Sequence, residues 1–175
     1  MSKTKKIAFC GLMTAVALGL SFMERFIPLQ MLIPLPGVKL GLANIVTLVL
    51  LYLFKPRYAF AVLVPRCLLG AIFGGGVTGL LFSLTGGVLA LLVMILAKKC
   101  PWFSVYGVSI LGAAAHNVGQ ILAAMVLLKS YWVGAYLPWL LLTALLTGTL
   151  IGAAGKGVIK PIMNAPVSAP AEMSR

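Results

Sequence analysis

Acidic residues are nearly absent from this chain. Among its 175 residues there is no aspartate, and Glu24 and Glu172 are the only glutamates. Paired carboxylates form Mg²⁺ sites, and Asp-rich motifs bind diphosphate groups through such ions. The sequence therefore excludes both kinds of site.

Metal ligands and phosphate-binding loops are also scarce. His116 is the only histidine, and Cys10, Cys67 and Cys100 lie far apart, without the spacing of metal ligands. We predict three free thiols, no metal site and no cofactor. A Gly-rich loop ending in Lys and Ser or Thr is missing, so this chain does not hydrolyse ATP itself.

Charged residues make up only 9% of the chain and hydrophobic residues 62%, far from the composition of a soluble domain. This composition predicts an integral membrane protein in contact with the lipid bilayer. The net charge of +12 does not indicate nucleic-acid binding, because the basic residues lie mostly at the ends of apolar segments. The positive-inside bias of membrane proteins places them there.

The apolar segments predict an all-α membrane protein with six transmembrane helices, since a span needs about 20 residues. The expected helices cover residues 7–23, 40–54, 58–73, 77–96, 105–128 and 138–159 of a single domain, residues 1–162. Residues 163–175, rich in Pro, Ala and Ser, are predicted to be a disordered tail. The first apolar run lacks a cleavage region, which predicts an uncleaved helix rather than a signal peptide. Most basic residues fall on the side of the N-terminus, so both termini are predicted to be cytoplasmic.

The segment 24–44 is the first candidate for a binding site. Residues 24–39 combine three prolines with many apolar side chains, a composition that precludes a regular helix and suggests a lid on the outer side. Lys39 and Asn44 follow at the entrance of the next predicted helix. A cation and an amide at the mouth of a membrane helix indicate part of a ligand site.

Arg66 lies in the interior of the predicted helix 58–73, where a charge costs at least about 2.5 to 3.5 kcal/mol on insertion scales. Because the chain has only two acids, a fixed carboxylate partner for Arg66 is not expected. Either carbonyls and amides of neighbouring helices satisfy the guanidinium, or it anchors an anionic or carbonyl-rich ligand. No predicted span interior carries the carboxylate that proton- or sodium-coupled carriers usually need.

Three polar residues, His116, Asn117 and Gln120, are close together in the predicted helix 105–128. Their spacing of three and four residues predicts that they share one helix face, which must point inward at this depth. A satisfied core histidine is the alternative to a binding site. Ser83, in a small-residue face of the preceding helix, fits either close packing or ligand binding.

The first helix carries a small-residue stripe, Gly11, Ala15 and Gly19, at intervals of four. Such a stripe lets another helix approach closely. It serves either internal packing or the docking of a partner subunit.

Several segments together resemble the Gx transporter family, also catalogued as heptaprenyl diphosphate synthase component I. They are the run Pro-Gly-Val-Lys-Leu-Gly-Leu-Ala-Asn at 36–44, Arg-Cys-Leu-Leu-Gly at 66–70, Phe-Ser-Leu-Thr-Gly-Gly at 82–87, and residues 112–120. Members are similar to the substrate-binding S components of energy-coupling factor transporters. The resemblance implies a bacterial plasma-membrane protein with six helices, a gate after the first helix, and a docking stripe for a transmembrane coupling subunit driven by two ATPases.

Two functions follow from the residues and the resemblance. The first is a non-enzymatic importer subunit that binds a small vitamin-like or anionic organic solute. Its binding residues would be Lys39, Asn44, Arg66, Ser83, His116, Asn117 and Gln120. The alternative is a non-catalytic membrane accessory of heptaprenyl diphosphate or quinone biosynthesis, since the missing aspartates rule out the elongation chemistry in this chain. A small channel or scaffold is a third alternative.

Overall fold

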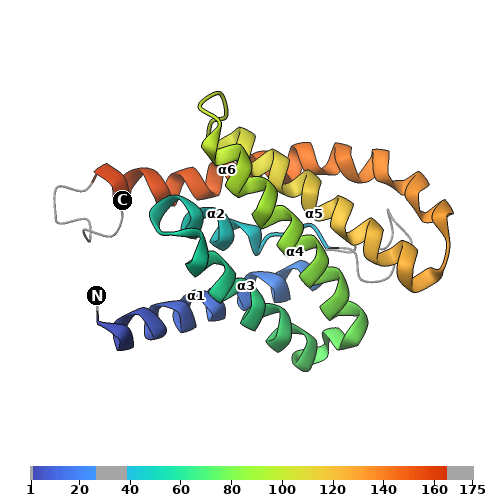
Figure 1. Ribbon diagram of the computed structural model, residues 1–175, viewed down its shortest axis with the longest axis horizontal. Helices are drawn as coiled ribbons and strands as arrows, with labels where there is room; N and C mark the ends of the chain where they lie inside the picture. Colours follow the sequence, from blue (N-terminus) through green and yellow to red (C-terminus); the bar gives the residue numbers. More distant parts are fainter. Residues whose placement is uncertain (1, 27–38, 165–175) are drawn as a thin grey trace.

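The computed structural model describes residues 2–26 and 39–164 (Figure 1). This part of the chain is helical, without a β-strand. Most of the predicted lid, and residues 165–175 of the predicted tail, lie outside the described residues. The main helices are α1 (Lys3–Met23), α2 (Asn44–Leu53), α3 (Pro56–Gly70), α4 (Gly76–Lys99), α5 (Val105–Leu128) and α6 (Leu137–Asn164).

Length and composition mark four stretches of the described chain as candidate membrane spans. They are Lys3–Met23, Pro56–Lys99, Val105–Leu128 and Tyr131–Asn164, and they make this a multi-pass membrane protein. The stretch of 44 residues contains both α3 and α4, and Figure 1 shows that the chain reverses between them. Gly74 and Gly76 allow this reversal with φ values of 105° and 58°, in the gap between the predicted helices 58–73 and 77–96.

Helix α2 is shorter than the sequence predicted. It begins at Asn44 rather than residue 40, because Gly41 has a φ of 82° and interrupts helical geometry just before it. Its 10 residues span about 15 Å at 1.5 Å per residue. That is about half of the roughly 30 Å hydrocarbon core.

Other helix ends also differ from prediction, and those of α1 and α6 differ most clearly. Helix α1 begins at Lys3 rather than residue 7, because the Ser2 hydroxyl caps it by accepting from the Lys5 backbone N–H at 3.4 Å. Helix α6 continues to Asn164 through Pro161, so the predicted end at 159 is wrong. The carbonyl that Pro161 leaves unpaired belongs to Gly157, which is exposed and can be hydrated.

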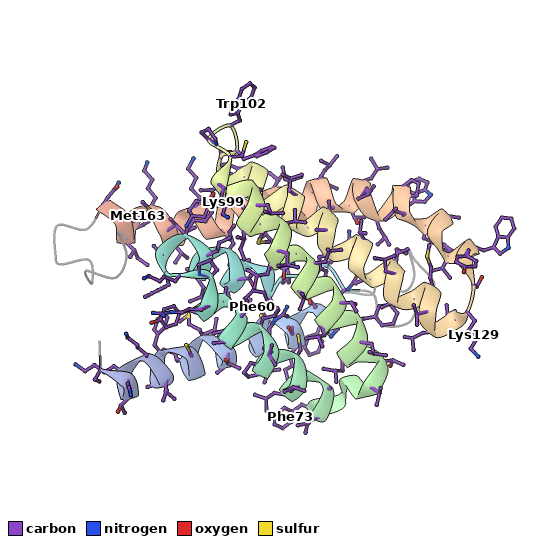
Figure 2. The ribbon with its side chains drawn as sticks, viewed as in Figure 1. Phe60, Phe73, Lys99, Trp102, Lys129 and Met163 are labelled. Atoms are coloured by element: carbon purple, nitrogen blue, oxygen red, sulfur yellow. The ribbon has the colours of Figure 1, made fainter. Side chains whose placement is uncertain are left out.

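Helix α5 packs between α4 and α6. A Cβ atom on Gly119 would lie 2.7 Å from the Thr85 carbonyl oxygen of α4, and one on Gly148 of α6 would lie 2.6 Å from Cα of Ile110. Glycine is needed at both crossings because the backbones approach too closely for any side chain. Figure 2 shows Trp102 beyond one end of α5 and Lys129 at the other. Such residues are typical of the borders of a membrane span.

Candidate functional site

Polar side chains gather around the start of α2. They come from the end of α1, from the chain just before α2, from α2 itself, and from α3, α4 and α5. We call this set the polar cluster: Glu24, Lys39, Asn44, Arg66, Ser83, His116 and Gln120. Lys39 is half-buried, and the other members are buried. Buried polar groups are costly unless they are paired, so their pairing shows what the cluster can bind.

Lys39 joins the segment before α2 to both α4 and α5. Its ammonium donates to the Ser83 hydroxyl at 3.0 Å. The hydrogen-bonding pattern orients the Gln120 amide so that its oxygen accepts from the Lys39 backbone N–H at 3.0 Å and its nitrogen donates to the Lys39 carbonyl at 3.2 Å. The backbone at Lys39 is thereby held in place by a side chain 81 residues later in the sequence.

His116 packs between two glycines. Its Nε2–H donates to the Gln120 amide oxygen at 3.2 Å in the same orientation. A Cβ atom on Gly41 would lie 3.2 Å from His116 Cδ2, and one on Gly86 would lie 2.9 Å from Nδ1. The imidazole is therefore held by Gln120 and by close contact with the backbone on two sides.

Arg66 is 6% exposed and lies beside Pro65 inside α3. Its Nη1 donates to the Ser21 hydroxyl of α1 at 3.4 Å. Its Nε and Nη2 have no hydrogen-bond partner among the described residues. Gly87 of α4 makes room for this side chain, because a Cβ atom there would lie 3.1 Å from Nη2.

Glu24 is the member of the cluster that sequence reasoning missed. It follows α1, is 5% exposed, and accepts hydrogen bonds from the backbone N–H groups of Gly41 and Leu42. Burial raises the pKa of its carboxyl group, while the two backbone donors and the positive charges of Arg66 and Lys39 oppose this shift. The positive charge of Arg66 acts on this carboxyl group, but the hydrogen bond of Glu24 goes to Leu42 and that of Arg66 to Ser21, so the expectation that Arg66 has no fixed carboxylate partner stays a prediction. The available signal was that one of only two acids ends the first apolar helix.

Asn44 is the most completely unsatisfied member. It is 1% exposed, and neither its amide oxygen nor its amide nitrogen has a hydrogen-bond partner within the described part of the chain. A Cβ atom on Gly41 would lie 2.9 Å from the Asn44 Nδ2 atom, which places this amide next to His116. Together with the free edge of Arg66, Asn44 offers unused donors and an unused acceptor to a ligand.

Asn117, predicted to share a face with His116 and Gln120, makes a different contact. Its amide nitrogen donates to the Leu140 carbonyl of α6 at 2.6 Å. The structure therefore brings together six of the seven predicted binding residues and places Asn117 at the contact between α5 and α6.

The predicted docking stripe lies on the outside of α1. Gly11, Ala15 and Gly19 are exposed, and a Cβ atom on either glycine would meet nothing within 4 Å in the described residues. Gly11 and Ala15 line a groove of about 700 Å³ between α1 and α3. The stripe is thus not used for packing within the described part of the protein.

The described residues contain no group of three or more His, Cys, Asp or Glu side chains that could hold a metal ion. The cysteines within them, Cys10, Cys67 and Cys100, are free thiols, as predicted. The unused groups of the cluster are hydrogen-bonding atoms of Arg66, Asn44 and His116, which suit an organic ligand.

The fold and the cluster define a helical multi-pass membrane protein with a buried, incompletely paired polar centre. The chain belongs to the heptaprenyl diphosphate synthase component I family, whose model matches residues 13–158. The expected family membership is confirmed. Comparison with curated proteins and with solved structures gives no match. The family is named for one component of a synthase, and that name does not establish a catalytic role.

Proposed function

We propose that this protein is the solute-binding subunit of a membrane importer, similar to the S components of energy-coupling factor transporters, and that it is not an enzyme. The solute is a small anionic or vitamin-like organic molecule, and it binds in the polar cluster. The observation that carries this proposal is the set of buried unpaired atoms, Nε and Nη2 of Arg66 and both amide atoms of Asn44.

These atoms favour binding over a purely structural role. A buried donor or acceptor without a partner costs about 1 to 3 kcal/mol, more for a charged group. Of the six such side-chain atoms in the described part of the chain, five belong to the cluster residues Asn44, Arg66 and His116, and the sixth is Ser109 Oγ. A solute that satisfies them recovers that free energy on binding, which gives the site its affinity.

The architecture is consistent with an importer subunit of six spans with cytoplasmic termini in a bacterial plasma membrane. The start of α1 and the end of α6 lie at the same end of the molecule in Figure 1. The cluster then lies toward the outer half of the membrane. The open stripe on α1 would dock a transmembrane coupling subunit that works with two ATPases, since the missing phosphate loop requires an external source of energy.

Native mass spectrometry of the gently purified protein tests this function. We expect a small organic anion to leave the wild-type protein, and much less of it to be retained by Arg66→Ala and Asn44→Ala. Arg57→Ala is the matched control, because Arg57 is exposed and lies outside the cluster. Equal retention of the solute by all three variants would contradict the proposed site.

The family assignment favours a second candidate, a membrane accessory subunit of heptaprenyl diphosphate or quinone biosynthesis. The absence of aspartate places the elongation chemistry in another chain. This candidate predicts that a soluble, Asp-rich prenyl synthase co-purifies with the protein. A prenyl chain or quinone precursor in the mass spectrum, together with that enzyme, would replace the importer by the accessory subunit.

A further inference from the structure

The unpaired atoms of Arg66 form one edge of its guanidinium. Nη1 is used by Ser21, whereas Nε and Nη2 are both unpaired in the described chain. In an arginine, Nε–H and the N–H of Nη2 that lies on the same side point in parallel. Two parallel donors about as far apart as the oxygens of a carboxylate bind such a group with two hydrogen bonds.

The surroundings of this edge favour a flat group with a single negative charge. The α4 backbone at Gly87 lies against the guanidinium, since a Cβ atom there would come within 3.1 Å of Nη2 and 2.7 Å of Leu63 Cδ1. A tetrahedral phosphate is bulkier than a flat carboxylate, and the close approach of α4 at Gly87 leaves less room beside Nη2 for the bulkier group. The Glu24 carboxyl group already shares the positive charges of Arg66 and Lys39, which disfavours a doubly charged ligand.

We propose that Arg66 binds a carboxylate of the solute side-on through Nε and Nη2, and that Gly87 contributes to this specificity because any side chain at this position would crowd Nη2. This inference rests on the proposed solute-binding function and adds the chemical class of the solute. It makes Arg66 the residue that selects carboxylates over phosphates and over neutral amides.

Arginine side-chain NMR provides a direct test. The chain has only four arginines, Arg25, Arg57, Arg66 and Arg175, so a protein labelled with ¹⁵N-arginine gives at most four Nε–H signals. Arg66→Lys identifies the Arg66 signal by its loss. The probes are benzoate, a planar monocarboxylate; phenyl phosphate, its tetrahedral dianionic counterpart; and benzamide, a neutral counterpart of the same shape.

We expect benzoate to shift the Arg66 signal saturably, phenyl phosphate to need at least about tenfold higher concentration, and benzamide to leave the signal unchanged. Tenfold to hundredfold is the usual effect of losing one hydrogen bond to a charged group. Equal or tighter binding of phenyl phosphate would overturn the proposal, as would benzoate shifts confined to the other arginines or no shift at all.

Variants distinguish the contribution of the paired N–H donors of Arg66 to benzoate binding from that of its positive charge. Arg66→Lys keeps the charge and loses the paired donors, so radiolabelled benzoate should bind at least about tenfold more weakly in equilibrium dialysis. Gly87→Ala should weaken benzoate binding by crowding Nη2. Gly79→Ala on the same helix should not, because a Cβ atom there meets nothing within 4 Å in the described residues. Equal weakening by the two glycine variants would contradict the assigned role of Gly87.

The inference and the proposed function can fail separately. A solute without a carboxylate that co-purifies with wild type and is lost in Asn44→Ala would leave the binding function intact and refute the carboxylate. No co-purifying solute and no benzoate shift would refute both.

Discussion

The Glu24 side chain accepts a hydrogen bond from the Leu42 backbone N–H, which ties the end of α1 to the chain just before α2. The described residues on either side of the segment 27–38 are thereby joined at one buried carboxyl group. This bond holds the backbone that precedes Asn44 in place. Glu24 therefore contributes to the cluster in two ways, by positioning this backbone and by its charge.

Replacing Glu24 separates these two contributions. Glu24→Ala removes the acceptor and leaves the buried N–H groups of Gly41 and Leu42 unpaired, which should lower the free energy of unfolding by about 1 to 3 kcal/mol. Glu24→Gln keeps an acceptor oxygen and should lose less. Unfolding of the detergent-solubilised protein, followed by circular dichroism, measures both. An alanine variant as stable as wild type would show that the bond contributes nothing.

Gly41 is expected to tolerate no side chain. Its φ of 82° costs an L-residue about 1 to 2 kcal/mol, and a Cβ atom would also crowd Asn44 and His116. Gly79→Ala is the contrasting control, because Gly79 lies inside α4 and a Cβ atom there meets nothing within 4 Å in the described residues. Gly41→Ala should therefore lower the melting temperature, whereas Gly79→Ala should leave it nearly unchanged. Equal shifts would mean that neither the backbone strain nor the crowding at Gly41 matters.

Asn117→Ala should destabilise the protein without changing solute binding by the folded fraction. The variant loses the bond to the Leu140 carbonyl, which keeps a second donor in the Thr143 hydroxyl at 2.9 Å. The expected loss is therefore at the lower end of the usual range, about 1 kcal/mol. Thermal unfolding and native mass spectrometry together measure this outcome. Loss of the co-purifying solute at unchanged stability would place Asn117 in the binding site.

The stripe on α1 predicts variants that fold normally and fail to dock. Gly11→Leu and Gly19→Leu project into open space in the described protein and should leave the melting temperature unchanged. Ala17→Leu on the same helix is the contrasting control, because Ala17 is fully buried and overpacking costs about 1 to 3 kcal/mol. Co-purification of a coupling subunit should be lost in the two glycine variants. Its retention would remove the stripe from the proposed interface.

Orientation in the membrane can be measured with thiol labelling of intact cells. The predicted topology places the loop between α5 and α6 outside and the loop after α4 inside. A membrane-impermeant thiol reagent should therefore label Ser130→Cys in intact cells, and native Cys100 only after permeabilisation. The reverse pattern would invert the topology and place the segment 24–39 in the cytoplasm.

The helical membrane fold is the part that the sequence by itself determined. Apolar runs of span length have few alternatives in a bilayer, because every backbone polar group must be paired inside its own segment. The predicted bounds of α5, Val105–Leu128, are confirmed at both ends. Local signals mark them: the Ser104 hydroxyl caps the start by accepting from the Gly107 N–H, and Lys129 adopts left-handed geometry at the end. The bounds of α2 were missed because glycine alone does not reveal the sign of φ.

Only the tertiary structure decided which polar residues meet. His116 and Asn117 are neighbours in sequence, yet one residue turns a helix by about 100°, so the first faces the cluster and the second faces α6. Lys39 and Ser83 are 44 residues apart, and Glu24 pairs across a segment that joins two helices. Such partners depend on how the helices pack, which a local pattern does not encode. The residue types indicated a binding site, and the packing selected its members and left Nε and Nη2 of Arg66 without a partner among the described residues.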